Sequence, residues 1–334
     1  MTFAHNQSAH CESGVISALL THSGLPMSEP MAFGLANALA FAYIPLVRIS
    51  GQPLIAYRLP PKFIIKALCK RLGVKVSFQK FGNPIRGADA LNAALEQGKL
   101  VGLQTSVYYL PYFPEEMRFH FNAHNLLVYG KEGDNYQISD PVFEAPVTVA
   151  SRHLNKARFA RGPLAPKGLM YSIESVPTQV DYARLIPEAI AKNCKVMTGA
   201  PLPIIGIRGI RHLARKIAGL KGSTKDQQLF LGHIVRMQEE IGTGGAGFRF
   251  IYASFLKESA GILQDDQLAQ AAQMMTDAGD QWRRFALTAV QQCKKTEVID
   301  LQKIAHELLT CADQELQVWE FLKGWLKEQK RRAA

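Results

Sequence analysis

The sequence lacks the features that mark a membrane-spanning, secreted or disulfide-stapled protein. No apolar run reaches the roughly 18 residues that a membrane-spanning helix needs. The first residues, MTFAHNQSAHCES, contain neither the basic region nor the long apolar core of a secretory signal. The five cysteines are an odd number, are widely spaced and form no CxxC pair, so neither a zinc knuckle nor a disulfide framework is indicated. We therefore expect a soluble, cytoplasmic protein without a membrane span.

The 334-residue chain has the composition of a globular protein with one large or two ordinary domains, because 47% of its residues are apolar and 20% are charged. Its 39 basic and 28 acidic residues leave a net charge of +11. Two stretches, 145–173 and 189–225, contain no acidic residue. Such stretches favour an acidic partner, whether nucleic acid, anionic lipid or an acidic protein. An ordinary solvated surface is the alternative interpretation.

The hydrophobic pattern divides the chain near residue 175. Before this point the pattern is mixed, with a helical spacing over 11–22 and a hairpin turn at EGDN (132–135) between two strand patterns. Further helices are expected over 60–73 and 88–98, and strands over 74–79, 100–110, 124–141 and 145–150. Later residues follow one amphipathic helical pattern after another. We predict an α+β protein with domains at 1–175 and 176–334, of which the second is all-α.

Three residues form a candidate catalytic group: Cys11, His124 and Asp140. Cys11 lies in the first turn of a predicted helix, where unpaired N–H groups and the helix dipole favour a thiolate. His124 begins one predicted strand and Asp140 ends its hairpin partner, so pairing of the strands brings both to the same end. An imidazole there can hold a carboxylate on one nitrogen and a thiol on the other. The alternative interpretation is a buried cysteine and a structural histidine.

These residues carry a resemblance to known proteins. A thiol on the first long helix, with His and Asp on a later hairpin, is similar to the arrangement in papain-like cysteine hydrolases. The sequence more closely resembles the butirosin biosynthesis protein H family, through HCES and SEPMAFGL (10–35), YYLPY (108–112) and HNLLVYG with DP (120–141). The later string GTGGAGFRFIYASFL (242–256) is also similar, so the resemblance covers nearly the whole chain.

The resemblance implies a papain-like cysteine-hydrolase-type N-terminal domain, a helical C-terminal domain for substrate or carrier-protein binding, and an acyltransferase activity in natural-product biosynthesis. The family prototype moves an amino-acyl group from an acyl carrier protein thioester to an amine of an aminoglycoside. Carried over, Cys11 is the nucleophile, His124 the base and Asp140 its orienting partner, and the small-molecule acceptor presents an amine or hydroxyl. No resident cofactor is implied, because phosphopantetheine arrives on the carrier protein. After Gly34 the chain reads LANALAFAY where a glycine-richer run is expected, which leaves the acyl group and the acceptor open.

Further residues are expected around this group. The Cys11 N–H and an upstream side chain, Asn6 or Gln7, are expected to form the oxyanion site. The residues expected to contact substrate are His10, Glu29, Tyr108, Tyr109 and Tyr112, although a half-buried strand also explains the tyrosines. A predicted helix at 208–219 presents cations that suit a phosphopantetheine phosphate or an acidic helix of a carrier protein. These cations are Arg208, Arg211, Arg215 and Lys216.

Other interpretations are also considered. A cysteine peptidase, amidase or thioester hydrolase would use the same triad with water as acceptor. A non-enzymatic nucleic-acid-binding protein would explain the charge, but the sequence has no zinc motif, RNP string or basic–aromatic interleaving, so we expect no nucleic acid partner. The glycines of 242–247 match GxGxxG without a preceding strand, and His120 with His124 lacks the glutamate of HExxH, so neither a dinucleotide nor a metal is expected. A homo-oligomer is left open.

Overall fold

The structure is a computed structural model that describes residues 3–49, 51–240, 242–294 and 298–333. The chain forms two compact units. The first unit combines Met1–Ala32 with Ile64–Val180, and the second, called the helical unit below, combines Phe33–Phe63 with Asp181–Ala334. None of the helices within the described ranges is long and apolar enough to span a bilayer.

The first unit is built on a six-stranded sheet with the strand order β3-β8-β4-β5-β6-β7. All its neighbouring strands are antiparallel. Central strands β4 and β5 carry fully buried apolar side chains such as Leu103 and Leu126, which form the core of this unit. The strands are β3 (Lys75–Gln79), β4 (Val101–Thr105), β5 (His124–Glu132), β6 (Asn135–Ser139), β7 (Val147–Ala150) and β8 (Met170–Ser175).

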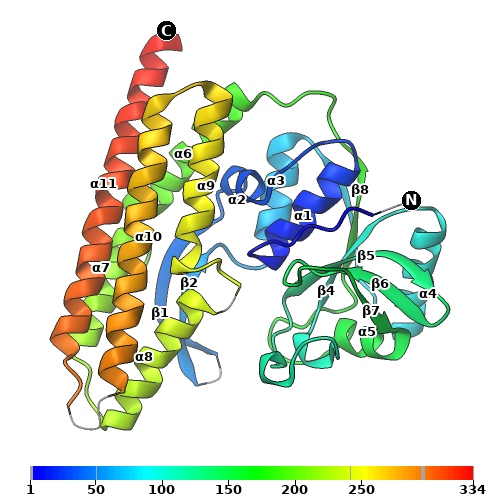
Figure 1. Ribbon diagram of the computed structural model, residues 1–334, viewed down its shortest axis with the longest axis horizontal. Coiled ribbons are helices and arrows are strands. Elements are labelled where there is room, and N and C mark those ends of the chain that lie inside the picture. Colours follow the sequence, from blue (N-terminus) through cyan, green and yellow to red (C-terminus); the bar gives the residue numbers. More distant parts are fainter. Residues whose placement is uncertain (1–2, 50, 241, 295–297, 334) are drawn as a thin grey trace. The chain divides into compact units, whose positions relative to one another are not determined.

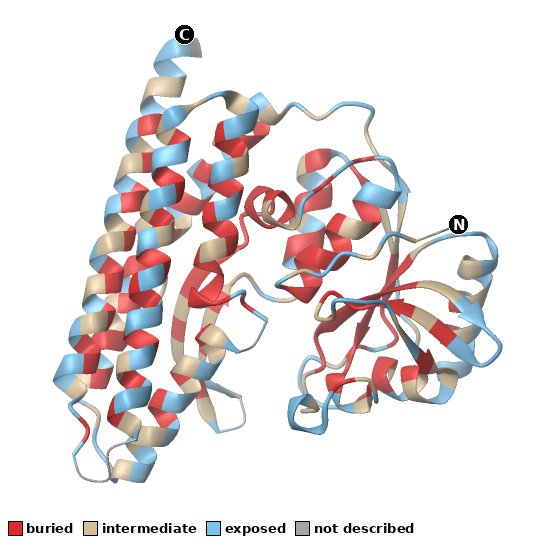
Figure 2. Cartoon of the chain, viewed as in Figure 1, coloured by how far each residue is buried: buried red, intermediate tan, exposed pale blue. Residues whose placement is uncertain are grey.

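Helices cover both faces of this sheet, with α1 on one face and α4 and α5 on the other (Figure 1). Helix α1 packs on β4, β5 and β8, and most of its residues are buried (Figure 2). Its first residue is Cys11, which therefore lies at the edge of the buried layer. The helices of this unit are α1 (Cys11–His22), α3 (Phe63–Leu72), α4 (Pro84–Glu96) and α5 (Ser151–Arg158), while α2 (Glu29–Leu35) contains the point at which the chain leaves the first unit.

The helical unit is a bundle in which α10 packs along both α9 and α11 (Figure 1). Buried residues recur along the inner side of each helix, as an amphipathic spacing requires (Figure 2). A hairpin of β1 (Leu39–Ile49) and β2 (Gln52–Arg58) packs against α6, α7 and α8. The helices are α6 (Tyr182–Gly199), α7 (Gly206–Ala218), α8 (Thr224–Glu239), α9 (Arg249–Leu263), α10 (Asp266–Cys293) and α11 (Leu301–Ala333).

A buried ion pair connects three helices of this unit. Arg249 Nε on α9 donates to Glu315 Oε1 on α11 over 2.8 Å, and both side chains are fully buried. The Trp282 indole on α10 donates to the same carboxylate. A carboxylate also holds the glycine-rich loop before α9, because the Ala246 N–H donates to Glu239. Since a buried charge is costly unless it is paired, these contacts fix the mutual positions of the helices.

The predicted α+β class is confirmed, with the six-stranded sheet in the first unit and the helices α6 to α11 in the later part of the chain. The sequence pattern misses the β1–β2 hairpin, because Pro45 and Pro53 interrupt its apolar run and proline is unfavourable within strands. Since this hairpin packs with the bundle, the division of the chain differs from the expected 1–175 and 176–334, and the second unit is not all-α. The strand expected over 100–110 ends at Thr105, where the chain turns into a short 3-10 helix.

Candidate active site

The N-terminus of α1 is held by side chains that surround Cys11. His10 caps the helix, with its Nδ1 accepting from the Ser13 N–H over 3.3 Å. The Glu29 carboxylate accepts from the N–H groups of Ala9 and His10, both at 2.8 Å, and from the Ser13 hydroxyl at 2.9 Å. Burial raises the pKa of Glu29, although these three hydrogen bonds act in the opposite direction. The loop that delivers Cys11 to the helix is therefore fixed by hydrogen bonds on both sides of the residue.

Helix α1 also makes a close approach to the chain just after Asp140. A Cβ atom at Gly14 would lie 2.6 Å from Ser8 Cβ and 2.9 Å from Pro141 Cβ, which is too close for any residue with a side chain. The Ser8 N–H donates to the Pro141 carbonyl over 2.8 Å. The absence of a side chain at Gly14 thus allows the first turn of α1 to lie against the end of the β5–β6 hairpin.

His124 and Asp140 meet at this end of the hairpin. His124 Nε2 lies 2.7 Å from Asp140 Oδ2, and the exposed fractions of the two residues are 3% and 0%. The same carboxylate accepts from the Tyr112 hydroxyl at 2.9 Å and, through Oδ1, from the Val142 N–H at 3.1 Å. The ring of Phe113 contacts the imidazole edge to face, with 5.4 Å between ring centroids. The carboxylate and the ring therefore each have a defined orientation.

Cys11 completes the group through a hydrogen bond with His124. Asp140 lies at Nε2 of the imidazole, which leaves Nδ1 as the nitrogen available to the thiol. Burial lowers the pKa of His124, but the charges and hydrogen bonds of Asp140 and Cys11 outweigh this effect and raise the pKa to about 10. At neutral pH the ring is thus an imidazolium between two acidic groups. The structure brings together the three residues that the sequence singles out.

The other residues expected at the site have varied positions. Asn6 and Gln7 are exposed, and the Gln7 amide donates to the Val142 carbonyl over 3.1 Å. His10 and Glu29 direct their hydrogen bonds at the start of α1, and Tyr112 directs its hydroxyl at Asp140, so all three lie around Cys11, His124 and Asp140.

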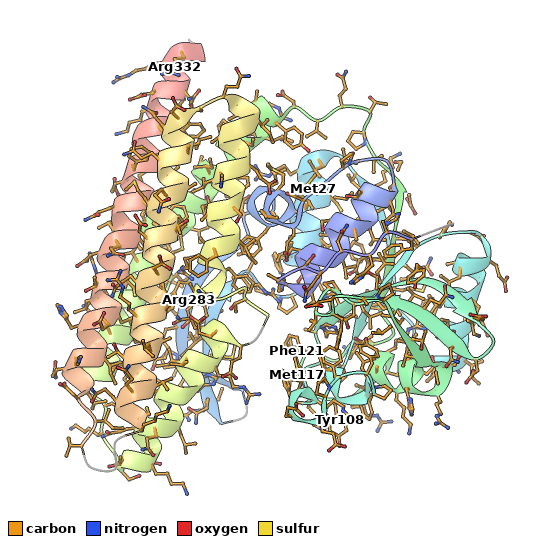
Figure 3. The ribbon with its side chains drawn as sticks, in the orientation of Figure 1. Met27, Tyr108, Met117, Phe121, Arg283 and Arg332 are labelled. Atoms are coloured by element: carbon orange, nitrogen blue, oxygen red, sulfur yellow. The ribbon has the colours of Figure 1, made fainter. Side chains whose placement is uncertain are left out.

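Tyr108 and Tyr109 lie instead in the irregular segment between β4 and β5. The Tyr108 ring stacks on His120 with centroids 4.0 Å apart, and Tyr109 meets Tyr108 edge to face. Figure 3 shows Tyr108, Met117 and Phe121 along this segment. His120 is thus part of an aromatic stack, and the described residues contain no cluster of three or more His, Cys, Asp or Glu suited to a metal ion.

Sequence reasoning missed some residues that position Cys11. Besides Gly14, it missed Glu12, a fully buried side chain whose Oε1 accepts from the N–H groups of Ile64 and Ile65 at the start of α3. The string HCESG contains both residues next to the thiol. Glu12 contacts a segment more than 50 residues away, and Gly14 lies against one more than 120 residues away. No local pattern in the sequence specifies such contacts.

Comparisons with known proteins agree with this geometry. The family profile described as "Butirosin biosynthesis protein H, N-terminal" matches residues 10–141, which include Cys11, His124 and Asp140. A second profile, described as a domain of unknown function (DUF4872), matches residues 152–322, about half of the chain. The chain belongs to the butirosin biosynthesis protein H-like family. Membership in this family supports a papain-like cysteine enzyme.

Among solved structures, one from Bacillus anthracis described as a C39-like peptidase is similar at 13% sequence identity and a TM-score of 0.38. The similarity covers 54% of this chain and 96% of that one. A search of curated proteins gives no match.

The raised pKa of His124 predicts a pH-dependent stability. Between its ordinary pKa of 6.5 and about 10 in the folded protein, the folded state binds a proton that the unfolded chain has released. The contribution of this ion pair is therefore complete below about pH 6.5 and is lost as the pH rises towards about 10. We expect the free energy of unfolding, measured by urea denaturation, to fall more steeply over this range in the wild type than in His124→Gln. Parallel pH profiles would contradict the assignment.

A second prediction concerns the thiols. Burial raises the pKa of Cys69 and Cys194 to about 12 and raises the pKa values of Cys293 and Cys311, whereas Cys11 has an imidazolium beside it. Iodoacetamide at neutral pH should therefore label Cys11 first, as measured by peptide mapping. Cys293 is more exposed than Cys11 and serves as the internal control. Labelling of Cys293 before Cys11 would mean that exposure alone sets reactivity.

Proposed function

We propose that this protein is a cysteine-dependent acyltransferase of natural-product biosynthesis. It takes an acyl group from the thioester of an acyl carrier protein, holds it on Cys11, and transfers it to an amine or hydroxyl of a small molecule. The observation that carries the proposal is the hydrogen-bonded series Cys11–His124–Asp140 at the start of a buried helix, in a chain of this family. The family prototype supplies the donor and acceptor classes.

The first half-reaction acylates Cys11. His124, as an imidazolium, already holds the proton of the Cys11 thiol, and the sulfur attacks the thioester carbonyl of the donor, which forms a tetrahedral oxyanion. Collapse of this intermediate breaks the bond to the donor sulfur, and His124 returns the proton to the departing thiol. The Asp140 carboxylate, 2.7 Å from the ring, stabilises the imidazolium that exists between these steps.

The second half-reaction releases the acyl group. Acylation removes the negative charge of Cys11, which is one of the contributions that raise the pKa of His124. The ring, having given its proton to the leaving thiol, then accepts one from the attacking amine or hydroxyl. An amide or ester forms as the Cys11 thiol leaves with the proton that His124 returns.

The oxyanion of both steps lies next to the N-terminus of α1. Cys11 is the first residue of that helix, so its N–H has no partner within the helix and is directed outward. This N–H is our proposed oxyanion donor. Asn6 and Gln7 stay as predictions for the second donor. The aromatic segment with Tyr108 and Tyr109 is the proposed contact surface for the acceptor.

Helix α7 is the proposed docking surface for the acidic carrier protein. Its apolar side is buried, while Arg208, Arg215 and Lys216 are exposed. Arg211 differs, because it forms an ion pair with Asp313 over 2.7 Å. Three of the four cations that the sequence singles out are therefore exposed to solvent, and within the described residues none of these three forms an ion pair with a carboxylate. Such a surface accelerates the encounter with an acidic partner.

Acyl transfer through Cys11 gives a direct prediction. Incubation with an acyl-loaded carrier protein should add the mass of the acyl group to Cys11, detected by intact-mass spectrometry, and Cys11→Ala should form no adduct. Asp140→Asn should retain the fold and slow transfer about 100- to 10,000-fold, because an amide does not stabilise the imidazolium. Asp89→Asn, the same change at an exposed residue of α4, is the matched control.

Other outcomes would point elsewhere. Full activity in Asp140→Asn would make that residue a structural cap of the hairpin. Release of free acid whatever amine is supplied would identify a hydrolase with the same triad. Salt-dependent binding to DNA, with unchanged function in Cys11→Ala, would favour a nucleic-acid-binding protein.

The docking surface gives a kinetic prediction. Reversal of charge in Arg208→Glu/Arg215→Glu should raise the KM for a carrier-bound donor about tenfold at low ionic strength, and should leave a small thioester unaffected. Lys192→Glu/Lys195→Glu, on exposed positions of α6, is the matched control. Equal losses with both donors would show that α7 has only a structural role.

A further inference from the structure

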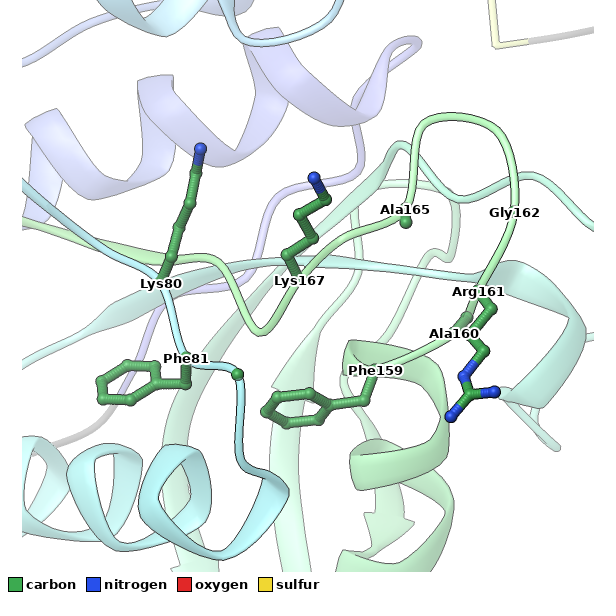
Figure 4. A pocket seen from close by; sticks show the side chains of 9 residues that line it. Lys80, Phe81, Phe159, Ala160, Arg161, Gly162, Ala165 and Lys167 are labelled. Atoms are coloured by element: carbon green, nitrogen blue, oxygen red, sulfur yellow. The ribbon is translucent and has the colours of Figure 1, made fainter.

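A cavity of about 490 Å³, open to solvent, lies in the first unit, and its lining does not include Cys11, His124 or Asp140. Its walls come from the segment after β3, the segment after α5 and the segment before β8 (Figure 4). The lining is aromatic and cationic, and includes no acidic residue. The six residues that decide its chemistry are Lys80, Phe81, Phe159, Arg161, Ala165 and Lys167.

The cations of this cavity lack counter-ions. Lys80, Arg161 and Lys167 are exposed, and across the described part of the chain none of the three forms an ion pair. Two of them belong to the acid-free stretch 145–173, so no acidic residue is near in sequence either. A ligand that carries negative charge is the chemical complement of this lining.

A buried arginine next to Phe159 adds to the positive charge. Arg158 is fully buried, its guanidinium lies 5.7 Å from the centroid of the Phe159 ring, and no described residue accepts a hydrogen bond from its Nε or Nη1. No carboxylate pairs with it among the described residues, in contrast to Arg249 in the helical unit. Arg158 therefore adds to the positive potential of this part of the first unit without a carboxylate that offsets it.

The loop that carries Lys167 is held in an unusual backbone conformation. Leu164 and Lys167 have φ angles of 57° and 54°, in the left-handed region that residues with side chains rarely adopt. Buried amide side chains hold the loop in place, since Gln104 donates to the Leu164 carbonyl and Asn122 donates to the Arg161 carbonyl. Strain that the surroundings enforce in this way is typical of functional segments.

The two lysines are neighbours. The Phe81 N–H donates to the Lys167 carbonyl over 3.2 Å, which places the backbones of Lys80 and Lys167 side by side. Figure 4 shows both lysine side chains extending to the same side, whereas Arg161 points the other way. The rings of Phe81 and Phe159 lie on the opposite side of the backbone from the two ammonium groups.

The cavity lies at the same end of the sheet as the candidate catalytic histidine. Gln79, the last residue of β3, pairs with Met170, the first residue of β8, while Thr105 at the end of β4 pairs with His124 at the start of β5. In the order β3-β8-β4-β5, three strand spacings separate β3 from β5. At about 4.8 Å per spacing this is about 14 Å, a distance that a long, flexible chain such as a pantetheine arm bridges.

We propose that this cavity binds the phosphate of a phosphorylated pantetheine thioester, the acyl donor. Lys80 and Lys167, whose side chains extend to the same side, would hold the phosphate as point charges. This inference rests on the proposed function for the identity of the donor. It assigns the phosphate to the first unit and leaves α7 as a docking surface for the carrier protein itself.

Binding can be measured without turnover. In Cys11→Ala protein, 4′-phosphopantetheine should bind at least about tenfold more tightly than pantetheine in isothermal titration calorimetry, because only the former has the phosphate. Lys80→Gln/Lys167→Gln should abolish this difference and leave the affinity for pantetheine unchanged. Arg152→Gln/Lys156→Gln removes the same charge from exposed positions of α5 and should retain the difference.

The outcomes separate the two proposals. Equal affinity for the two ligands in the protein with an intact cavity, or an equal loss in the α5 control, would overturn the phosphate site. A phosphate preference that depends on the two lysines, together with no acyl adduct on Cys11 from any thioester, would support the site and overturn the proposed function.

A further comparison distinguishes the sources of the phosphate. If coenzyme A competes with 4′-phosphopantetheine for the two lysines, the site accepts free cofactor thioesters. If only a carrier protein bearing the arm competes and its unmodified form does not, the site is specific for the carrier-bound arm. Failure of both to compete would overturn the site.

Discussion

The contact between His124 Nε2 and the Asp140 carboxylate is the interaction on which the candidate site depends. Both residues are buried, and the carboxylate 2.7 Å away is the main reason that the ring keeps its proton. The contact in turn needs the β5–β6 hairpin, which brings residues 16 positions apart to one end of the sheet. Tyr112 and the Val142 N–H occupy the remaining positions on the carboxylate and so hold its orientation.

The polar residues around Cys11 mainly hold the backbone near the thiol in position. His10 and Glu29 hold the turn that precedes the helix, and Glu12 caps a different helix through the N–H groups at its start. Gly14 allows the same turn to lie against Pro141. A short string around the thiol thus joins α1, α3 and the hairpin end, which explains why charged and polar residues are tolerated in a buried position.

The excess of basic residues is divided between two different environments. On α7 the cations are exposed over a buried apolar side, which suits a flat surface for a macromolecule. In the first unit Lys80 and Lys167 line a cavity and extend to the same side, which suits a small anionic group. The two buried arginines show the same contrast, because Arg249 has Glu315 and Arg158 has no carboxylate partner among the described residues. Net charge alone does not distinguish these cases.

The sequence by itself determined the elements whose signals are local. The extent of α1 from Cys11 to His22, the hairpin with its turn at EGDN and the helices after residue 180 follow from periodicity and turn residues, and so does the pairing of His124 with Asp140. Tertiary structure decided the rest. The β1–β2 hairpin belongs to the helical unit because it packs against α6, α7 and α8. Tyr112 reached Asp140, and Lys80 became a neighbour of Lys167, through contacts between segments far apart in the chain, and long-range contacts of this kind leave no periodic trace in a sequence.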